Sequence, residues 1–220
     1  MRDRSDGVHY PTTSTSTFAR VAVVSCVCLL GLLCATGCGK SAGPARGPSG
    51  ARTDVSAMQL TSPAIPTAAE GSSARMLSAK YATRSVVGGQ NLSIPYEWRD
   101  APITARSFAL LLVDRAPVAH DWVHWAVVNI PASATGLPEG ASESAGMPMG
   151  ATELDNTFGR PGYAGPQPPP GTGAHPYAAT LFALDVDRVD APPSVTAAEL
   201  EKLLAPHVLA QATCTGYFGR

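Results

Sequence analysis

The feature that most constrains this chain is the apolar run Val123–Ile130, which contains a single titratable side chain, His124. β-branched and aromatic residues at this density are typical of a strand in the core of a sheet. Strict alternation along such a strand puts Val123 on the same face as Trp125 and opposite His124. An imidazole in this setting is either a packed core histidine or part of a pocket wall, and the run alone leaves both open.

Other segments predict that strands dominate the folded part. Glycine and proline are frequent, at 21 and 20 residues, which favours a loop-rich β protein over a helical bundle. Extended segments are predicted at Leu60–Pro63, Met76–Tyr81, Leu92–Trp98, Ser107–Val113, Tyr177–Asp185 and Thr213–Phe218. Pro95 predicts an edge or a bulge in its segment, whereas the unbroken apolar run Ser107–Val113 predicts burial on both faces.

Helices are predicted only near the end of the sequence. Thr196 and Glu199 have the spacing of a capping box, which opens a helix with an inward side formed by Leu200, Leu203 and Leu204. Pro206 interrupts that helix and starts a second short one, in which Val208 and Leu209 face inward.

Residues 1–37 are predicted to be a lipoprotein-type signal peptide. Positive charge comes first, then the apolar stretch Val21–Leu33, then small residues directly ahead of Cys38. This order resembles a bacterial lipobox, with Ala35 where leucine is usual, and it implies cleavage before Cys38 and acylation of that cysteine. Ordinary secretion and a retained anchor are the alternatives, although the apolar stretch is short for a membrane span.

Residues 38–57 are rich in glycine, serine and proline and predict a flexible tether, which leaves 58–220 as one folded domain. Cys214 is the only cysteine in that domain, so it has neither an internal disulfide nor a cysteine-based zinc site. The 16 Lys+Arg nearly balance the 17 Asp+Glu, which gives no basic field for nucleic acid. The expected location is the outer side of a bacterial cell-envelope membrane, in the periplasm of a Gram-negative cell.

A second stretch that carries chemistry runs from Phe158 to Tyr177. Its first part, Phe158–Gly171, is crowded with proline, which fixes φ, and with glycine, which lets two backbones approach closely. A stiff loop is therefore expected there. His175 and Tyr177 follow it and point to the same side of the next strand.

Five groups of residues recur in a consistent order: Asn91, Ser93, Pro95 and Trp98; Val113–Pro117; His124-Trp125 with Asn129-Ile130-Pro131; Leu137–Gly140; and Phe158-Gly159 through Gly165-Pro166 to His175 and Tyr177. In this order they resemble the phosphatidylethanolamine-binding protein family, in its bacterial and archaeal Raf-kinase-inhibitor-like branch. The resemblance covers about Leu60 to Arg220, which is nearly the whole folded part.

The resemblance implies a mainly β fold in which a large central antiparallel sheet packs on a smaller sheet, with C-terminal α-helices. It implies an anion pocket for a phosphate or a phosphorylated head group, formed by Asp114, His124, Gly165, Pro166, His175 and Tyr177. It also implies a non-enzymatic role in lipid head-group binding or in inhibition of a kinase or protease, with no cofactor. Bacterial relatives suggest a homodimer.

The residue types fit an anion site. Imidazoles, a phenol and the backbone N–H groups of a glycine-rich loop can all donate to phosphate oxygens. Asp114 is expected to orient a histidine and favour its protonated form, or to accept from a head-group ammonium. The sequence departs from the family at Arg115, near the place of a second aspartate, and at Pro176, where arginine is usual. An inward Arg115 would favour a more anionic ligand.

Two other classes of function stay open. A hydrolase would use His124 and His175, although the sequence has no Gly-x-Ser-x-Gly elbow and no Walker loop. A structural envelope lipoprotein would keep only a vestigial pocket. His120 and His124 would face one way on a strand and could hold a metal, but two histidines alone are a weak metal site, and no metal is predicted.

Overall fold

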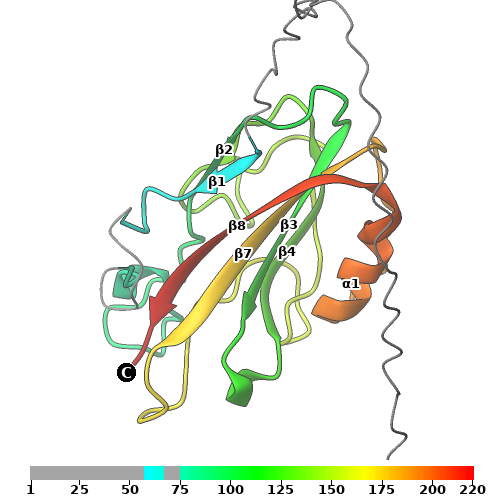
Figure 1. The fold of residues 1–220 in the computed structure, drawn as a ribbon. Helices are drawn as coiled ribbons and strands as arrows, with labels where there is room; N and C mark the ends of the chain where they lie inside the picture. Colours follow the sequence, from blue (N-terminus) through cyan, green and yellow to red (C-terminus); the bar gives the residue numbers. More distant parts are fainter. Residues whose placement is uncertain (1–56, 67–74) are drawn as a thin grey trace, which may run out of the picture. The chain divides into compact units, whose positions relative to one another are not determined.

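The structure, a computed structural model, describes residues 57–66 and 75–220 (Figure 1). The predicted signal peptide, the acylated Cys38 and all but the last residue of the tether lie outside these ranges. Among the described residues, none of the helices has the length and apolar character needed to cross a bilayer.

Two antiparallel sheets form the body of the domain (Figure 1). The smaller sheet has the order β1-β2-β5, with bounds Gln59–Thr61, Tyr96–Arg99 and Gly136–Leu137. The larger sheet has the order β6-β4-β3-β7-β8, with bounds Thr152–Glu153, Trp122–Pro131, Ser107–Asp114, His175–Leu184 and Val208–Phe218. The predicted mainly β fold, with a large antiparallel sheet against a smaller one, is confirmed.

Helical structure is limited in the described ranges to one α-helix and three short 3₁₀ turns. The helix α1 spans Ala197–Leu204, and the turns η2, η3 and η4 span Ala79–Tyr81, Pro117–Ala119 and Ala205–His207. The prediction of several C-terminal helices is therefore reduced to a single short one.

The five-stranded sheet has an apolar core on each face. Leu110 and Leu112 of β3 face the smaller sheet, where they join Tyr96. Leu111 faces α1, where it packs with Leu200. The predicted burial of this strand on both faces is confirmed, because every residue of β3 is buried. The central strand is thus packed on both faces up to the end where the site forms.

The strand β4 contains a β-bulge at His124. Leu112 of β3 pairs with Trp125, but the next residue, Val113, pairs with Val123, so His124 is an extra residue on β4. The predicted alternation is therefore wrong here: Val123 packs on the α1 side, whereas Trp125 packs between the sheets. Bulges of this kind redirect a side chain and often lie beside functional sites.

The predicted capping box is confirmed. The Thr196 hydroxyl accepts from Glu199 N at 3.2 Å, and Thr196 N donates to Glu199 Oε2 at 2.9 Å. Leu200 and Leu204 are fully buried, but Leu203 is 36% exposed, so its predicted inward position is wrong.

The second helix predicted after Pro206 is also wrong. Only the turn η4 forms there, because Val208 pairs with Leu184 and begins β8. Leu209 is left 41% exposed. Pairing with β7 along the whole of β8 overrides the local helix signal of the proline.

Two further strand predictions need correction. In Met76–Tyr81, only Met76 makes a bridge, with Tyr217, and the end of the segment is the turn η2. In Leu92–Trp98 the strand begins only at Tyr96, after Pro95, which has no N–H for a ladder. The predicted alternation does hold there, with Tyr96 and Trp98 buried and Glu97 exposed.

Candidate functional site

The two stretches that carry chemistry meet at one end of the larger sheet. Asp114, the last residue of β3, lies opposite Trp122 of β4 on one side and opposite Tyr177 of β7 on the other. His124 lies two residues further along β4, and His175 lies two residues before Tyr177. Because β3 is flanked by both strands, this register brings all these side chains to the same edge.

A cavity of about 580 Å³ opens at this edge. Of the residues predicted for an anion pocket, five line it, namely Asp114, His124, Gly165, His175 and Tyr177. Pro166 is not among the lining residues; its carbonyl accepts from Thr83 N at 3.2 Å instead.

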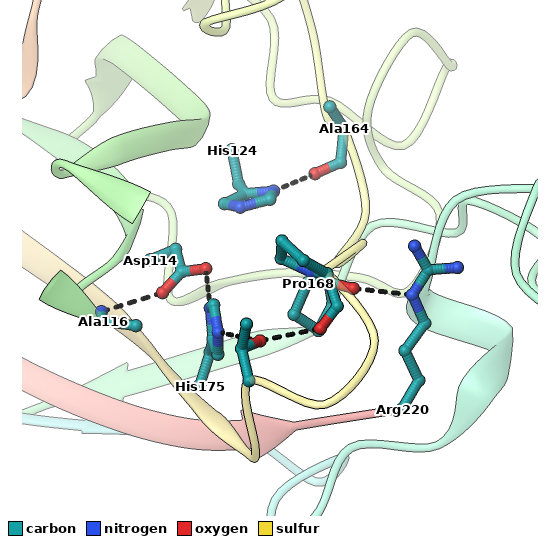
Figure 2. Close-up of polar contacts among 9 residues, drawn as sticks. Asp114, Ala116, His124, Ala164, Pro168, His175 and Arg220 are labelled. Atoms are coloured by element: carbon teal, nitrogen blue, oxygen red, sulfur yellow. Dashed lines mark hydrogen bonds and ion pairs between the residues drawn. The ribbon is translucent and has the colours of Figure 1, made fainter. Parts of the chain in front are cut away.

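Asp114 and His175 form a buried pair in the floor of the cavity (Figure 2). The Oδ2 atom of Asp114 lies 2.6 Å from His175 Nδ1, and Oδ1 accepts from Ala116 N at 2.9 Å. Both side chains are at least 94% buried. Asp114 thus orients a histidine, as its chemistry suggested, and the histidine is His175.

Thr172 fixes the protons of this pair. Its hydroxyl donates to Pro169 O at 2.7 Å and lies 2.9 Å from His175 Nε2. A hydroxyl has one proton, so Nε2 must be the donor in the second contact. Nδ1 lies 2.6 Å from Asp114 Oδ2, so both ring nitrogens of His175 are used within the protein.

His124 has a different environment. Its Nδ1 lies 2.6 Å from Ala164 O, and a carbonyl only accepts, so Nδ1 carries the proton (Figure 2). Burial lowers the pKa of His124, and the bond to Ala164 opposes this only in part. The ring is therefore neutral at pH 7 and leaves Nε2 as its available nitrogen.

Tyr177 supplies an unused donor. Its side chain is 1% exposed, and its hydroxyl has no hydrogen-bond partner among the described residues. Burial raises the pKa of Tyr177, and the nearby Asp114 carboxylate raises it further without reaching hydrogen-bonding geometry. The phenol therefore keeps its proton. Its ring packs edge-on against His124, with 5.1 Å between centroids, so both groups belong to one surface.

The loop that contains Gly165 is held by its backbone. A Cβ at Gly165 would lie 2.2 Å from Tyr81 O, so only glycine fits this approach. The Gly165 N–H donates to Asn91 Oδ1 at 2.8 Å, and the Ala164 N–H donates to His124 O at 2.8 Å. The sequence suggested backbone N–H groups of this loop as anion donors, but those of Ala164 and Gly165 are already committed to the fold.

The mouth of the cavity contains residues that sequence reasoning did not assign to it. Trp122 and Phe158 pack edge to face at 5.1 Å, and Phe158 and Val118 are each about half exposed. The other such lining residues are Ala119, His120, Thr157, Gln167, Pro168 and Pro169. The proline-rich segment after Phe158 was the sequence feature that could have predicted these lining residues. The outcome is a polar floor beneath a largely apolar mouth.

Arg115 does not line the cavity. Its guanidinium makes ion pairs with Asp121 at 2.9 Å and with Glu201 of α1 at 2.7 Å. Arg115 therefore gives no reason to expect a more anionic ligand.

The metal alternative assumed that His120 and His124 lie on one strand. This assumption is wrong, because β4 begins at Trp122 and His120 lies outside it. Within 57–66 and 75–220, no group of three or more His, Cys, Asp or Glu side chains is placed to hold a metal ion.

A larger hollow of about 880 Å³ lies elsewhere, beside β2 and β5. Its lining includes Glu97, which is exposed, and no histidine. The larger hollow also has a buried phenol, Tyr96, but the buried acid and both buried imidazoles are in the smaller cavity. We therefore assign the candidate site to the smaller one.

A two-sheet β domain with a small polar-floored cavity at the end of its central strand defines a class of ligand-binding proteins. The sequence profile described as "Phosphatidylethanolamine-binding protein" matches residues 67–219. The chain therefore belongs to the phosphatidylethanolamine-binding protein family, as its motifs predicted.

Individual relatives support this family assignment. UPF0098 protein YbhB of Escherichia coli is 37% identical over 132 residues, which is 59% of this chain and 83% of YbhB. A UPF0098 protein of Methanothermobacter thermautotrophicus is 34% identical over 138 residues, 63% of this chain and 89% of that protein.

The crystal structure of E. coli YbcL, described as a new member of the mammalian PEBP family, aligns with a TM-score of 0.65. The two are 30% identical, and the alignment covers 74% of this chain and 98% of YbcL. One relative, LppC of Mycobacterium tuberculosis, carries a lipoprotein name. It is 34% identical over 130 residues, 59% of this chain and 61% of LppC.

Proposed function

We propose that the domain binds a small phosphate-bearing ligand in the cavity and does not transform it. The observation that carries this proposal is the unpartnered Tyr177 hydroxyl beside the available Nε2 of His124. Buried polar groups are nearly always hydrogen-bonded, so a buried, unpartnered hydroxyl on a residue that lines a cavity supports a ligand that supplies the partner.

The charges of the floor favour a modestly charged anion. Asp114 and His175 neutralise each other, and His124 is neutral, so the floor has no net charge before binding. An anion can accept from Tyr177 directly, and it favours the protonated form of His124, whose Nε2 then becomes a second donor. Binding is thereby coupled to the uptake of one proton at His124.

The size of the cavity fits more than a bare phosphate. Ligand pockets for small organic molecules have volumes of roughly 300–1,000 Å³, and this cavity has about 580 Å³. The apolar mouth at Val118, Trp122 and Phe158 suits the organic part of a phosphate ester. A phosphorylated head group is one such ligand.

We propose further that the domain is tethered to the cell envelope through Cys38, after removal of residues 1–37. The order of charge, apolar stretch and cysteine supports this, and so does the similarity to LppC. Replacement of Cys38 by serine is expected to block acylation and processing, so that the uncleaved precursor accumulates. A Cys38→Ser form that is processed and stays membrane-bound contradicts the tether.

A hydrolase is the second candidate, and one observation favours it. Asp114, His175 and Thr172 form a carboxylate–imidazole–hydroxyl chain with contacts of 2.6 and 2.9 Å, which is the order of groups in serine hydrolases. Against it, the Thr172 proton goes to Pro169 O rather than to the imidazole, and Thr172 does not line the cavity. These contacts favour a role for Thr172 in positioning His175 over a role as a nucleophile.

Titration with inorganic phosphate and with phosphoethanolamine, followed by the histidine ring signals in NMR spectra, tests the binding proposal. Saturable shifts of the histidine signals at millimolar ligand or below are expected in the wild type. In His124→Ala the remaining histidine signals should show no saturable shift. The absence of saturable shifts in the wild type contradicts binding. Turnover of simple esters that is lost in Thr172→Val would establish the hydrolase instead.

A further inference from the structure

His120 lies at the mouth of the cavity, and nothing in the fold uses its side chain. It follows the turn η3 and caps it with a left-handed backbone, φ 50°, and Asp121 continues this with φ 56°. The imidazole is exposed and lines the cavity, and it makes no hydrogen bond or ion pair with a residue in the described ranges.

The position of this imidazole is held from outside the cavity. Two successive non-glycine residues in the left-handed region are unfavourable, and such strain persists where the surroundings fix it. Here Arg115 connects the side chain of Asp121 to Glu201 of α1, with distances of 2.9 and 2.7 Å. Arg115 therefore fixes the turn that presents His120, although it does not reach the cavity itself.

We propose that His120 is a specificity-determining residue that makes the cavity prefer phosphate monoesters to phosphate diesters. The inference rests on the proposed phosphate binding. A monoester has three non-bridging oxygens and a diester has two. His120 can add one donor to those of Tyr177 and of His124 after its proton uptake, and a monoester offers one oxygen more than a diester to accept it.

The apolar residues at the mouth of the cavity also favour monoesters over diesters. Once three oxygens face the three donors, the single ester oxygen leads its substituent outward past Val118 and Phe158, which are about half exposed. A diester must place a second substituent inside, next to the buried Asp114–His175 pair, where it meets no apolar surface of comparable exposure.

Isothermal titration calorimetry of the full chain with methyl phosphate and with dimethyl phosphate tests the inference. His120→Asn is the informative variant because asparagine tolerates a left-handed backbone and lacks the imidazole. It is expected to weaken methyl phosphate binding about tenfold, the effect of one charge-assisted hydrogen bond, and to leave dimethyl phosphate binding unchanged. The control is His207→Asn, whose imidazole is also partly exposed but pairs with Asp185 at 3.0 Å outside the cavity.

Arg115→Gln tests the support of the turn. As a positioning residue, Arg115 should lose part of the monoester preference when replaced, about threefold, and the double variant with His120→Asn should lose no more than His120→Asn alone. A purely structural role of Arg115 would weaken both esters equally.

The outcomes separate the inference from the function on which it rests. If the wild type binds neither ester, phosphate binding fails. If it binds and His120→Asn keeps the wild-type ratio of monoester to diester affinity, the inference is overturned while the proposed function stands.

Discussion

His175 and His124 are both buried histidines at one end of the same sheet, with exposures of 2% and 4%, yet their hydrogen bonds differ. His175 uses both ring nitrogens within the protein, one with Asp114 and one with Thr172. His124 uses one nitrogen, with Ala164, and leaves the other for the cavity. The first histidine is part of the framework, and the second is available to a ligand.

The difference teaches that burial and residue type do not by themselves identify a binding residue. A hydrogen-bond count separates the two roles, because each neutral or charged form of the ring has a fixed number of donors. By this count His124 and Tyr177 each keep a polar atom outside the hydrogen bonds of the fold, whereas Asp114 and His175 are bonded to each other. Variants of these four residues test this division.

The largest effect is expected for Asp114→Asn. Removal of the carboxylate breaks its buried pair with His175, which costs about 3 kcal/mol of the free energy of unfolding. Urea denaturation at pH 7 measures it. Asp187→Asn is the matched control, because Asp187 pairs with Arg106 on the surface, where an ion pair contributes about 1 kcal/mol or less. Equal losses in the two variants would mean that the His175 pair is not a charged framework contact.

A smaller effect on folding is expected for His124→Gln. One hydrogen bond, to Ala164, is lost, which costs about 1 kcal/mol of the free energy of unfolding. Phosphate affinity should nevertheless fall at least tenfold, a loss of about 1.4 kcal/mol in binding. His175→Gln should show the larger loss of stability of the two. If both variants lose the same free energy of unfolding, His175 is no more a framework residue than His124.

The dependence on pH should also come from His124. Its pKa is lowered from 6.5 by burial, so below pH 6.5 the unfolded chain takes up a proton that the folded chain resists. Stability is therefore full above pH 6.5 and falls as the pH drops toward the folded-state pKa. Sulfate, which does not titrate in this range, should bind more tightly over the same interval. Denaturation and calorimetry between pH 7.5 and 5 check both slopes, and each should flatten in His124→Gln.

The smallest effect on folding is expected for Tyr177→Phe. Its hydroxyl has no partner among the described residues, so its removal should change the free energy of unfolding by less than about 1 kcal/mol. Phosphate affinity should still fall several-fold. Tyr96→Phe is the control, since its hydroxyl is equally buried and unpartnered but lies outside this cavity. A loss of affinity in both variants would point to a general effect of packing rather than to a contact with phosphate.

Much of the site could be predicted from residue order. The motif residues identified Asp114, His124, His175 and Tyr177, and one cavity brings them together. Alternation placed His175 and Tyr177 on one side of β7, and both are buried there. Alternation failed on β4, because the bulge at His124 depends on how β3 and β4 pair and not on the residues of β4 alone.

The outward position of Arg115 was equally inaccessible to sequence reasoning. Its partner Glu201 lies 86 residues away on α1, so the direction of its side chain depends on where the helix docks. The same docking sets the turn that carries His120. Neither follows from a local pattern of residues.

The sequence by itself determined the central strands β3, β4 and β7, the capping box at Thr196 and the set of candidate anion-binding residues. These follow from short-range rules, namely steric limits on φ and ψ, alternation and local capping. Only the tertiary structure decided which ring nitrogens of His124 and His175 are bonded within the protein. Asp114 and His175 are 61 residues apart, and their contact depends on strand register and on the path of the proline loop. Protonation follows from those contacts, so the division between framework and ligand-facing groups is a property of the fold.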